Sequence, residues 1–455
     1  MFRMSLLFLS LLTAGCVSLD PDYHKPAPPI PAVWSGTQNG AAAPAVLRDW
    51  QEVVTDARLK SVVQTALTNN RDVQKAIADI DAARALYGEQ RSDLFPSLDA
   101  GLSTTRSRSL AAGYGTSSSA VGTASFELDL FGRNQSLSRA AKEVWLASEF
   151  TAQNTRLTLV AEITTAWVTM AADNSNLALA QEIMNSAQDS LNIVKRQQRV
   201  GVASVTDVSE AMSVYQQARS AVASYRTVVM QDKNALDLLA GQSLPASVLP
   251  GTLESLNTNT IVLVPAGVSS SVLLRRPDIQ EAEHQLKSAN ADIGAARANF
   301  FPSISLTGTA GYASGPLGQL WGHGMNIWSF TPSISLPIFN GGLNESQLHY
   351  AEAEKKAMVA SYEKSIQSAF RDVSDALARR STLDEQLDAQ RQYVAAEQQT
   401  LDVAEQRYKE GVGDYLTVLT ARRTLWSAQR QLIALQQTNF DNRITLWQSL
   451  GGGVN

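Results

Sequence analysis

The sequence predicts an α+β membrane protein built from two similar halves, each combining long helices with one β-hairpin. Three observations predict this fold class: the chain repeats its own pattern, long segments without proline have helical periodicity, and four short segments alternate apolar with polar residues. A repeat of roughly 200 residues is too long for a solenoid, whose units are about 20 to 45 residues. The halves are therefore expected to be pseudo-symmetric parts of a larger assembly.

The duplication is visible as residues that recur at two nearly constant separations. A helix followed by a strand that begins after proline recurs 206 residues later, and a glycine turn with its following helix recurs 210 residues later. We expect a first repeat at residues 50–240, a linker at 241–271 and a second repeat at 272–455. Matched residues include Leu67 and Leu273, Asp72 and Asp278, Pro96 and Pro302, Gly201 and Gly411, Val202 and Val412, and Gly241 and Gly451.

The composition favours long packed helices over a large globular core. Hydrophobic residues make up 44% of the 455 residues but aromatic residues only 7%. Abundant small side chains allow helices to approach closely. The formal net charge is −5, with 38 Lys and Arg against 43 Asp and Glu. This balance gives no electrostatic basis for binding nucleic acid.

The N-terminus has the pattern of a secretory signal followed by a lipid attachment site. An apolar run at residues 6–12 is too short to remain as a spanning helix. Residues 13–16 resemble a bacterial lipobox, which implies removal of residues 1–15 and a covalent lipid, including palmitate, on Cys16, the only cysteine. By the lipoprotein sorting rule, Val17 favours the outer membrane. An ordinary signal peptide with an incidental cysteine is the alternative.

The prolines after Cys16 predict an extended arm over residues 16–49. Beyond it, helical periodicity predicts long helices that turn at Gly201 and Gly411. At about 1.5 Å per residue the longest are on the order of 100 Å, so they are expected to lie side by side as a coiled-coil-like assembly. The predicted helices span residues 56–94, 137–200, 207–239, 277–299 and 343–410, with a last one returning to 450.

Two hairpins, at residues 97–131 and 303–339, alternate in character along each strand. Even positions such as Phe126 and Phe330 are apolar, while odd positions are mostly Ser and Thr or, at Glu127 and Asp129, acidic. Strands of about ten residues with one apolar and one polar face are typical of membrane barrels. Two hairpins lying on a soluble core are the alternative.

Four strands are too few to close a membrane barrel, since the smallest known have eight. An open sheet edge in lipid would leave backbone groups without hydrogen bonds. The chain is therefore expected to oligomerise, two copies giving eight strands and three giving twelve.

Five blocks together resemble the outer membrane efflux factors, the TolC-like channels, and in particular their lipoprotein branch. The resemblance covers the whole mature chain and implies a homotrimer, with a twelve-strand outer-membrane barrel continuous with a twelve-helix periplasmic tunnel that a partner opens. The blocks are residues 16–23 with Pro26, 126–133, 273–279, 300–304 and 336–342.

The resemblance assigns a gate to the turns at the periplasmic tip. By position, Leu416 resembles the constricting apolar ring of the lipoprotein members, and Thr420 stands where some of them carry an aspartate ring. Acidic side chains at Asp207, Glu210 and Asp414 are expected to supply negative potential instead.

Arg422 and Arg423 are expected to hold the closed state by salt bridges between helices, with a solvated helix face as the alternative. The tip turns resemble those that dock the hairpin of a periplasmic adaptor. Their candidate contacts are Gly201, Val202, Ser204, Gly411 and Val412.

The predicted function is a passive exit channel for drugs or other small molecules, joined to a periplasmic adaptor and an inner-membrane pump and conferring multidrug resistance. An outlet for secreted polypeptides or metal ions is the close alternative, and a lipid-tethered periplasmic structural coiled coil is the alternative from another class. The sequence contains no catalytic or metal-binding pattern: its four histidines are scattered and its eight methionines do not cluster. We expect no enzymatic activity and no cofactor besides the lipid.

Overall fold

The structure is a computed structural model that describes residues 18–31, 34, 49–109, 113–263, 269–322 and 324–453. The predicted signal and Cys16 lie outside the described residues. The chain forms two compact units, and each draws on both repeats, so the repeats are not separate domains. Unit 1 comprises Met1–Pro28, Ala78–Thr151 and Asp278–Ser365, and unit 2 comprises Pro29–Ile77, Ala152–Pro277 and Ile366–Asn455.

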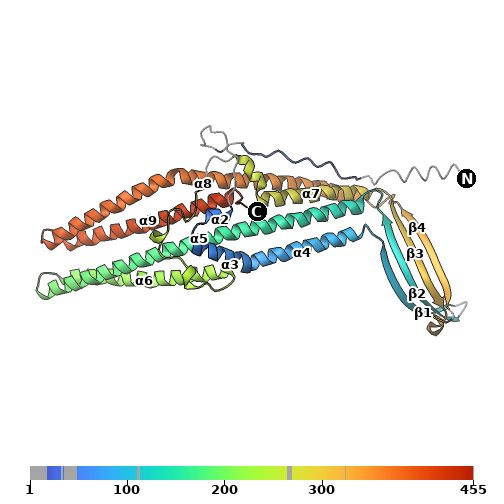
Figure 1. The fold of residues 1–455 in the computed structure, drawn as a ribbon, viewed down its shortest axis with the longest axis horizontal. Coiled ribbons are helices and arrows are strands. Elements are labelled where there is room, and N and C mark those ends of the chain that lie inside the picture. The colour runs from blue at the N-terminus through green and yellow to red at the C-terminus, as the bar shows by residue number, and fades with distance from the viewer. Residues whose placement is uncertain are drawn as a thin grey trace. The chain divides into compact units, whose positions relative to one another are not determined.

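The helices have matching lengths in the two repeats (Figure 1). The longest, α5 and α8, have 67 residues each, and α4 and α7 have 22 each. No helix in the described part of the chain is both long and apolar enough to cross a membrane. The helices are α2 (Trp50–Val53), α3 (Ala57–Asn69), α4 (Arg71–Ser92), α5 (Arg133–Arg199), α6 (Val205–Ala240), α7 (Pro277–Ala298), α8 (Leu343–Lys409) and α9 (Tyr415–Ser449), with short 3₁₀ turns η1 (Ala246–Val248), η2 (Leu253–Ser255), η3 (Ser270–Arg275) and η4 (Leu317–Gln319).

The single helix predicted at 56–94 is wrong, because Asn70 divides it into α3 and α4. Asn70 has an extended backbone, and its side-chain oxygen accepts hydrogen bonds from the backbone N–H of Asp72 at 2.8 Å and of Val73 at 3.1 Å. Asn70 thus caps α4. Its side-chain nitrogen also donates to the carbonyl of Leu239 at 2.9 Å. The break therefore attaches the start of α4 to the end of α6.

The second repeat has a break at the matching position, Arg276, between η3 and α7. The Arg276 guanidinium donates to the carbonyl of Ser449 at 2.5 Å. Ser449 stands 210 residues after Leu239, so the same connection is made in both repeats with a different side chain.

The strands form one antiparallel sheet in the order β1-β2-β3-β4, as two hairpins placed side by side. Every pair in the register joins an even position to an even one or an odd to an odd, for example Phe126 to Leu306 and Gly308 to Phe330. The predicted apolar and polar faces are therefore continuous across all four strands. The strands are β1 (Ser97–Ser109), β2 (Gly113–Leu128), β3 (Ser303–Ser314) and β4 (Met325–Ser335).

One acidic residue assigned to the strands by the sequence lies beyond them. β2 ends at Leu128, and the carboxylate of Asp129 accepts a hydrogen bond from the backbone N–H of Gln135 at 2.8 Å, at the start of α5. Glu127 stays on the polar face and pairs with Arg133 at 3.1 Å. Asp129 thus satisfies the first turn of α5 instead of lining the sheet.

The N-terminal arm is extended over the described residues 18–31 and packs on unit 1 as far as Pro28. Asp20 pairs with Arg139 on α5 at 2.7 Å, and Lys25 pairs with Glu283 on α7 at 2.5 Å. The guanidinium of Arg297 donates to the carbonyl of Leu19 at 3.2 Å. Three side chains from two helices of unit 1, α5 and α7, thus fix the arm.

Candidate functional site

The candidate site comprises the two turns of unit 2 that join α5 to α6 and α8 to α9. In the first turn Gly201 has φ +78°, and its N–H donates to the carbonyl of Gln198 at 3.0 Å, while the N–H of Val202 donates to the carbonyl of Gln197 at 2.9 Å. This pair of bonds is a Schellman motif, which ends a helix at a left-handed residue. The second turn has the same two bonds, at 3.1 and 3.0 Å, with φ +75° at Gly411.

The helices that follow the two turns begin with caps of opposite arrangement. At α6 the hydroxyl of Ser204 accepts from the N–H of Asp207 at 3.1 Å, and the carboxylate of Asp207 accepts from the N–H of Ser204 at 2.7 Å. At α9 the carboxylate is on the cap residue itself, because Asp414 accepts from the N–H of Thr417 at 2.8 Å. The hydroxyl and backbone N–H of Thr417 hold the pKa of Asp414 below its usual value. Both acidic residues therefore stand at a helix N-terminus, where negative charge is stabilised.

The predicted gate residues Leu416, Thr420 and Arg423 lie on one exposed face of α9. Their spacing of four and then three residues places them on one side of a helix. Leu416 is 61% exposed, while the neighbouring Leu419 is buried in the core of unit 2. Glu210 is exposed at the matching position on α6. The structure thus brings the predicted gate residues together on a face that this chain does not cover.

Arg422 makes the salt bridge between helices that the sequence predicted, and it lies within one chain. Its guanidinium pairs with Glu405 on α8 at 2.6 Å and also donates to the hydroxyl of Ser190 on α5. Only 13% of the Arg422 side chain is exposed. This contact fixes α9 against both long helices of unit 2.

Arg423 makes no such contact within the chain as far as the structure describes it. Together with Trp426, Arg430 and Tyr225 it lines a cavity of about 270 Å³ between α5, α6 and α9, and it pairs with no acidic residue in the part of the chain that the structure describes. Its position on the exposed face follows from the burial of Arg422, one residue earlier.

The sequence analysis did not predict the contacts that join the two helical hairpins, α5 with α6 and α8 with α9, near their turns. The hydroxyl of Tyr408 on α8 donates to the side chain of Gln197 on α5 at 2.9 Å, and its ring lies 5.4 Å from that of Tyr415. Burial, with the nearby charge of Asp207, raises the pKa of Tyr408. Both tyrosines lack a counterpart 210 residues earlier, where Gln198 and Val205 stand, and this asymmetry was the available signal. The surrounding core contains Ala187, Leu191, Val194, Ala211, Val214 and Leu419.

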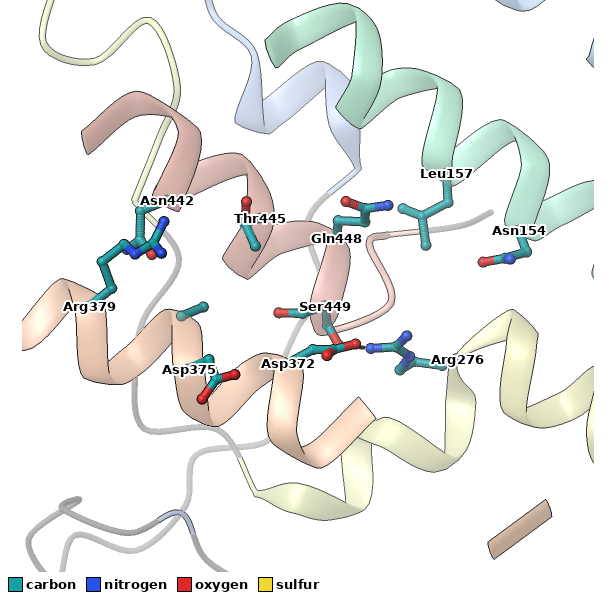
Figure 2. A pocket seen from close by; sticks show the side chains of 11 residues that line it. Asn154, Leu157, Arg276, Asp372, Asp375, Arg379, Asn442, Thr445, Gln448 and Ser449 are labelled. Atoms are coloured by element: carbon teal, nitrogen blue, oxygen red, sulfur yellow. Dashed lines mark hydrogen bonds between the residues drawn. The ribbon is translucent and has the colours of Figure 1, made fainter. Parts of the chain in front are cut away.

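A second polar cavity of about 340 Å³ lies in unit 2 where α8 and α9 meet α5, and the sequence did not predict it (Figure 2). Asp372, Asp375 and Arg379 line it from α8, and Arg276 reaches Ser449 at the end of α9. The described residues contain no group of three or more His, Cys, Asp or Glu placed to hold a metal ion.

Comparison with known proteins identifies the family. The family model described as outer membrane efflux protein matches residues 62–242 and 268–452. The chain belongs to the outer membrane efflux protein family. Two Pseudomonas putida members, an antibiotic efflux pump outer membrane protein, ArpC, and a toluene efflux pump outer membrane protein, TtgC, are each 43% identical to it over 99% of this chain and 95% of theirs. The cation efflux system protein CusC of Escherichia coli is 38% identical over 98% of both chains.

Solved structures of efflux family members have the same fold. A CusC crystal structure covers 96% of this chain and 100% of its own, with TM-score 0.87 and 37% identity. The open state of the Neisseria gonorrhoeae MtrE outer membrane channel covers 96% and 99%, with TM-score 0.86 and 34% identity. These channels are trimers with four strands per chain. The fold is therefore that of the homotrimeric channels, in which each chain supplies four strands of a twelve-strand barrel.

Proposed function

We propose that this chain is the outer-membrane exit channel of a tripartite efflux system, which passively conducts drugs or other small organic molecules delivered by an inner-membrane pump and a periplasmic adaptor. The observation that carries the proposal is the sheet with two continuous faces. Its even face exposes large apolar side chains such as Leu98 and Phe330, at 83% and 62%, and its odd face is polar. Such a sheet suits a barrel with lipid outside and water inside.

The periplasmic gate of this channel is formed by α9 of each of three chains. Leu416 supplies an apolar constriction, Thr420 and Arg423 continue its face, and Asp414 adds negative charge at the cap of α9, with Asp207 and Glu210 as the acidic residues of the first repeat. The exposure of this face in the single chain supports the assignment. The Arg422 contact then holds α9 in position while the gate is closed.

The adaptor binds at the two helical turns. Val202 and Val412 are 76% and 64% exposed although they are apolar, and each sits on a turn that a Schellman motif makes rigid. Exposed apolar side chains on rigid turns are suited to a protein contact. Cysteines placed at Ser204 and Asp414, crosslinked in cells, should capture one periplasmic protein, and its identity follows from mass spectrometry. A covalent lipid on Cys16 supplies a second membrane anchor, so Cys16→Ala should lose the lipid and keep membrane association through the barrel.

Small organic molecules are favoured over metal ions as cargo. The relatives named for toluene and antibiotic efflux are 43% identical to this chain, and the relative named for cation efflux is 38% identical. The outlet itself neither hydrolyses a nucleotide nor modifies its cargo, and the pump supplies the energy. Outlets for metal ions or polypeptides use the same architecture and remain the second candidates.

Deletion of the gene and complementation test the function. Loss of the protein should increase accumulation of a fluorescent hydrophobic dye and sensitivity to toluene, with no change in sensitivity to copper or silver. Sensitivity to the metals alone would reassign the cargo to cations. Unchanged accumulation and unchanged sensitivity to both classes would contradict an efflux outlet and favour a structural protein.

A further inference from the structure

The acidic and basic residues of the four strands lie on opposite faces of the sheet and at different distances along the strands. The acidic ones are Asp99 and Glu127, at odd positions, and the basic ones are Arg106 and Arg108, at even positions. Because the register keeps even positions together, both arginines lie on the apolar face of the sheet, in line with Leu102. The acidic pair lies on the polar face.

The two arginines are close to the end of β1, away from the helices. α4 and α7 lead into β1 and β3, and α5 and α8 follow β2 and β4, so all helices leave from one end of the sheet. The end of β1 and the start of β2 are at the other end. In an outer-membrane barrel whose helices stand in the periplasm, that end reaches the outer leaflet.

An exposed tyrosine holds the two guanidinium groups together. Arg108 pairs with Tyr114 in the register, and the guanidinium carbons of Arg106 and Arg108 lie 5.6 and 5.3 Å from the centre of its ring. Tyr114 is 69% exposed, and both arginines are exposed. Neither arginine forms an ion pair with a carboxylate among the described residues. Two positive charges are therefore presented side by side above an apolar surface.

A cation on the lipid face of a barrel is destabilising at mid-membrane and tolerated only near the headgroups. Guanidinium groups bind phosphate through two parallel hydrogen bonds. We propose that Arg106, Arg108 and Tyr114 form a binding site for the phosphate groups of lipopolysaccharide in the outer leaflet, with the acyl chains packed on the apolar face below. The matching positions of the second hairpin carry Tyr312 and Ser314. Each trimer therefore has three such sites, alternating with three uncharged hairpins.

Binding of lipopolysaccharide to the purified trimer, counted by native mass spectrometry and titrated in detergent, tests the site. Arg106→Gln with Arg108→Gln should weaken binding about tenfold or more, and Arg106→Lys with Arg108→Lys, which keeps both charges but not the paired hydrogen bonds of a guanidinium, should restore only part of it. Adding Ser107→Arg to the Gln pair returns one charge at the same height on the polar face, and it should not restore binding. Equal binding by the Gln pair, or recovery with Ser107→Arg, would overturn the proposal.

The chemistry of the lipid separates phosphate recognition from apolar adhesion. Enzymatically dephosphorylated lipopolysaccharide should bind wild type as weakly as the intact lipid binds the Gln pair, and should bind the two proteins equally. Inorganic phosphate at millimolar concentration should not displace the lipid, and displacement would make this a site for free anions. Elution of each variant at the volume of the wild-type trimer in size-exclusion chromatography shows that the variant is folded. The inference rests on the barrel's position and not on conduction, so its failure would leave the proposed channel untouched.

Discussion

The two helical turns of unit 2 have the same backbone conformation but different capping side chains. Both end a 67-residue helix with a left-handed glycine and a Schellman motif. The first turn then starts α6 with a serine cap and a carboxylate three residues later, while the second starts α9 with a carboxylate cap and a threonine three residues later. Only the second is followed by an exposed Leu and by Arg422. Duplication has thus preserved the backbone of the turn, while the side chains have taken different roles in the two repeats.

The largest expected effect comes from the contact that only the second repeat has. Arg422→Ala removes the ion pair with Glu405 and the hydrogen bond to Ser190, and leaves Glu405 only the longer pair with Lys409 at 3.9 Å. The free energy of unfolding should fall by about 2 kcal/mol, since the Arg422 and Glu405 side chains are only partly exposed. Urea unfolding of the trimer measures it. The neighbouring exposed Arg423→Ala is the matched control and should change stability by less than about 0.5 kcal/mol. Equal effects of the two substitutions would show that the Arg422 contact is not what holds α9.

The glycines should respond equally in both turns. A Cβ added at Gly201 or Gly411 meets nothing within 4 Å, so only the left-handed backbone is strained, which costs about 1 kcal/mol. At Gly241, which has the same hand of backbone, an added Cβ would stand 2.3 Å from the carbonyl oxygen of Asn69, and its substitution by Ala should be clearly worse. The free energies of unfolding of the three Ala variants test this order. Unequal losses of stability at the two turns would contradict their equivalence.

Tyr408→Phe removes the hydrogen bond to Gln197 and keeps the ring packed on Tyr415. A loss of about 1 kcal/mol in the free energy of unfolding is expected, typical of one hydrogen bond. Gln197→Leu in the same background should add little, because the two changes remove the same contact. Additive losses in this double-mutant cycle would mean that the two side chains do not act together.

The smallest effect is the acid sensitivity of the second turn. The folded pKa of Asp414 is below its ordinary value, so its stabilisation is fully present above the unfolded pKa of about 3.9 and is lost as the pH falls through the folded pKa. Asp414→Ser keeps a cap that does not titrate. The stability of wild type relative to this variant should therefore decrease between pH 5 and pH 2.5, as urea midpoints will show. A constant difference would argue against the carboxylate cap.

Much of this fold could be predicted from the sequence because its periodicities are long and undisturbed. The period-two pattern placed Phe126 and Phe330 on one face, and the register confirms it. The break at Asn70 was missed because apolar spacing continues through it, and only a contact with Leu239, far away in sequence, shows what it does. Arg422 and Arg423 could not be told apart, since the phase of α9 depends on which face the core buries. The number of strands in the barrel depends on how many chains associate, and it was inferred from the structural relatives.

We propose that the second repeat gates a conducting channel. Single-channel conductance in planar bilayers measures this gating, with Leu416→Ala compared with Thr206→Ala, the exposed matching position of the first repeat. Wild type should conduct weakly, Leu416→Ala should raise the conductance several-fold, and Thr206→Ala should leave it unchanged. Equal conductance of all three proteins would contradict the division of labour between the repeats, and the absence of channels in all three would contradict the exit channel itself.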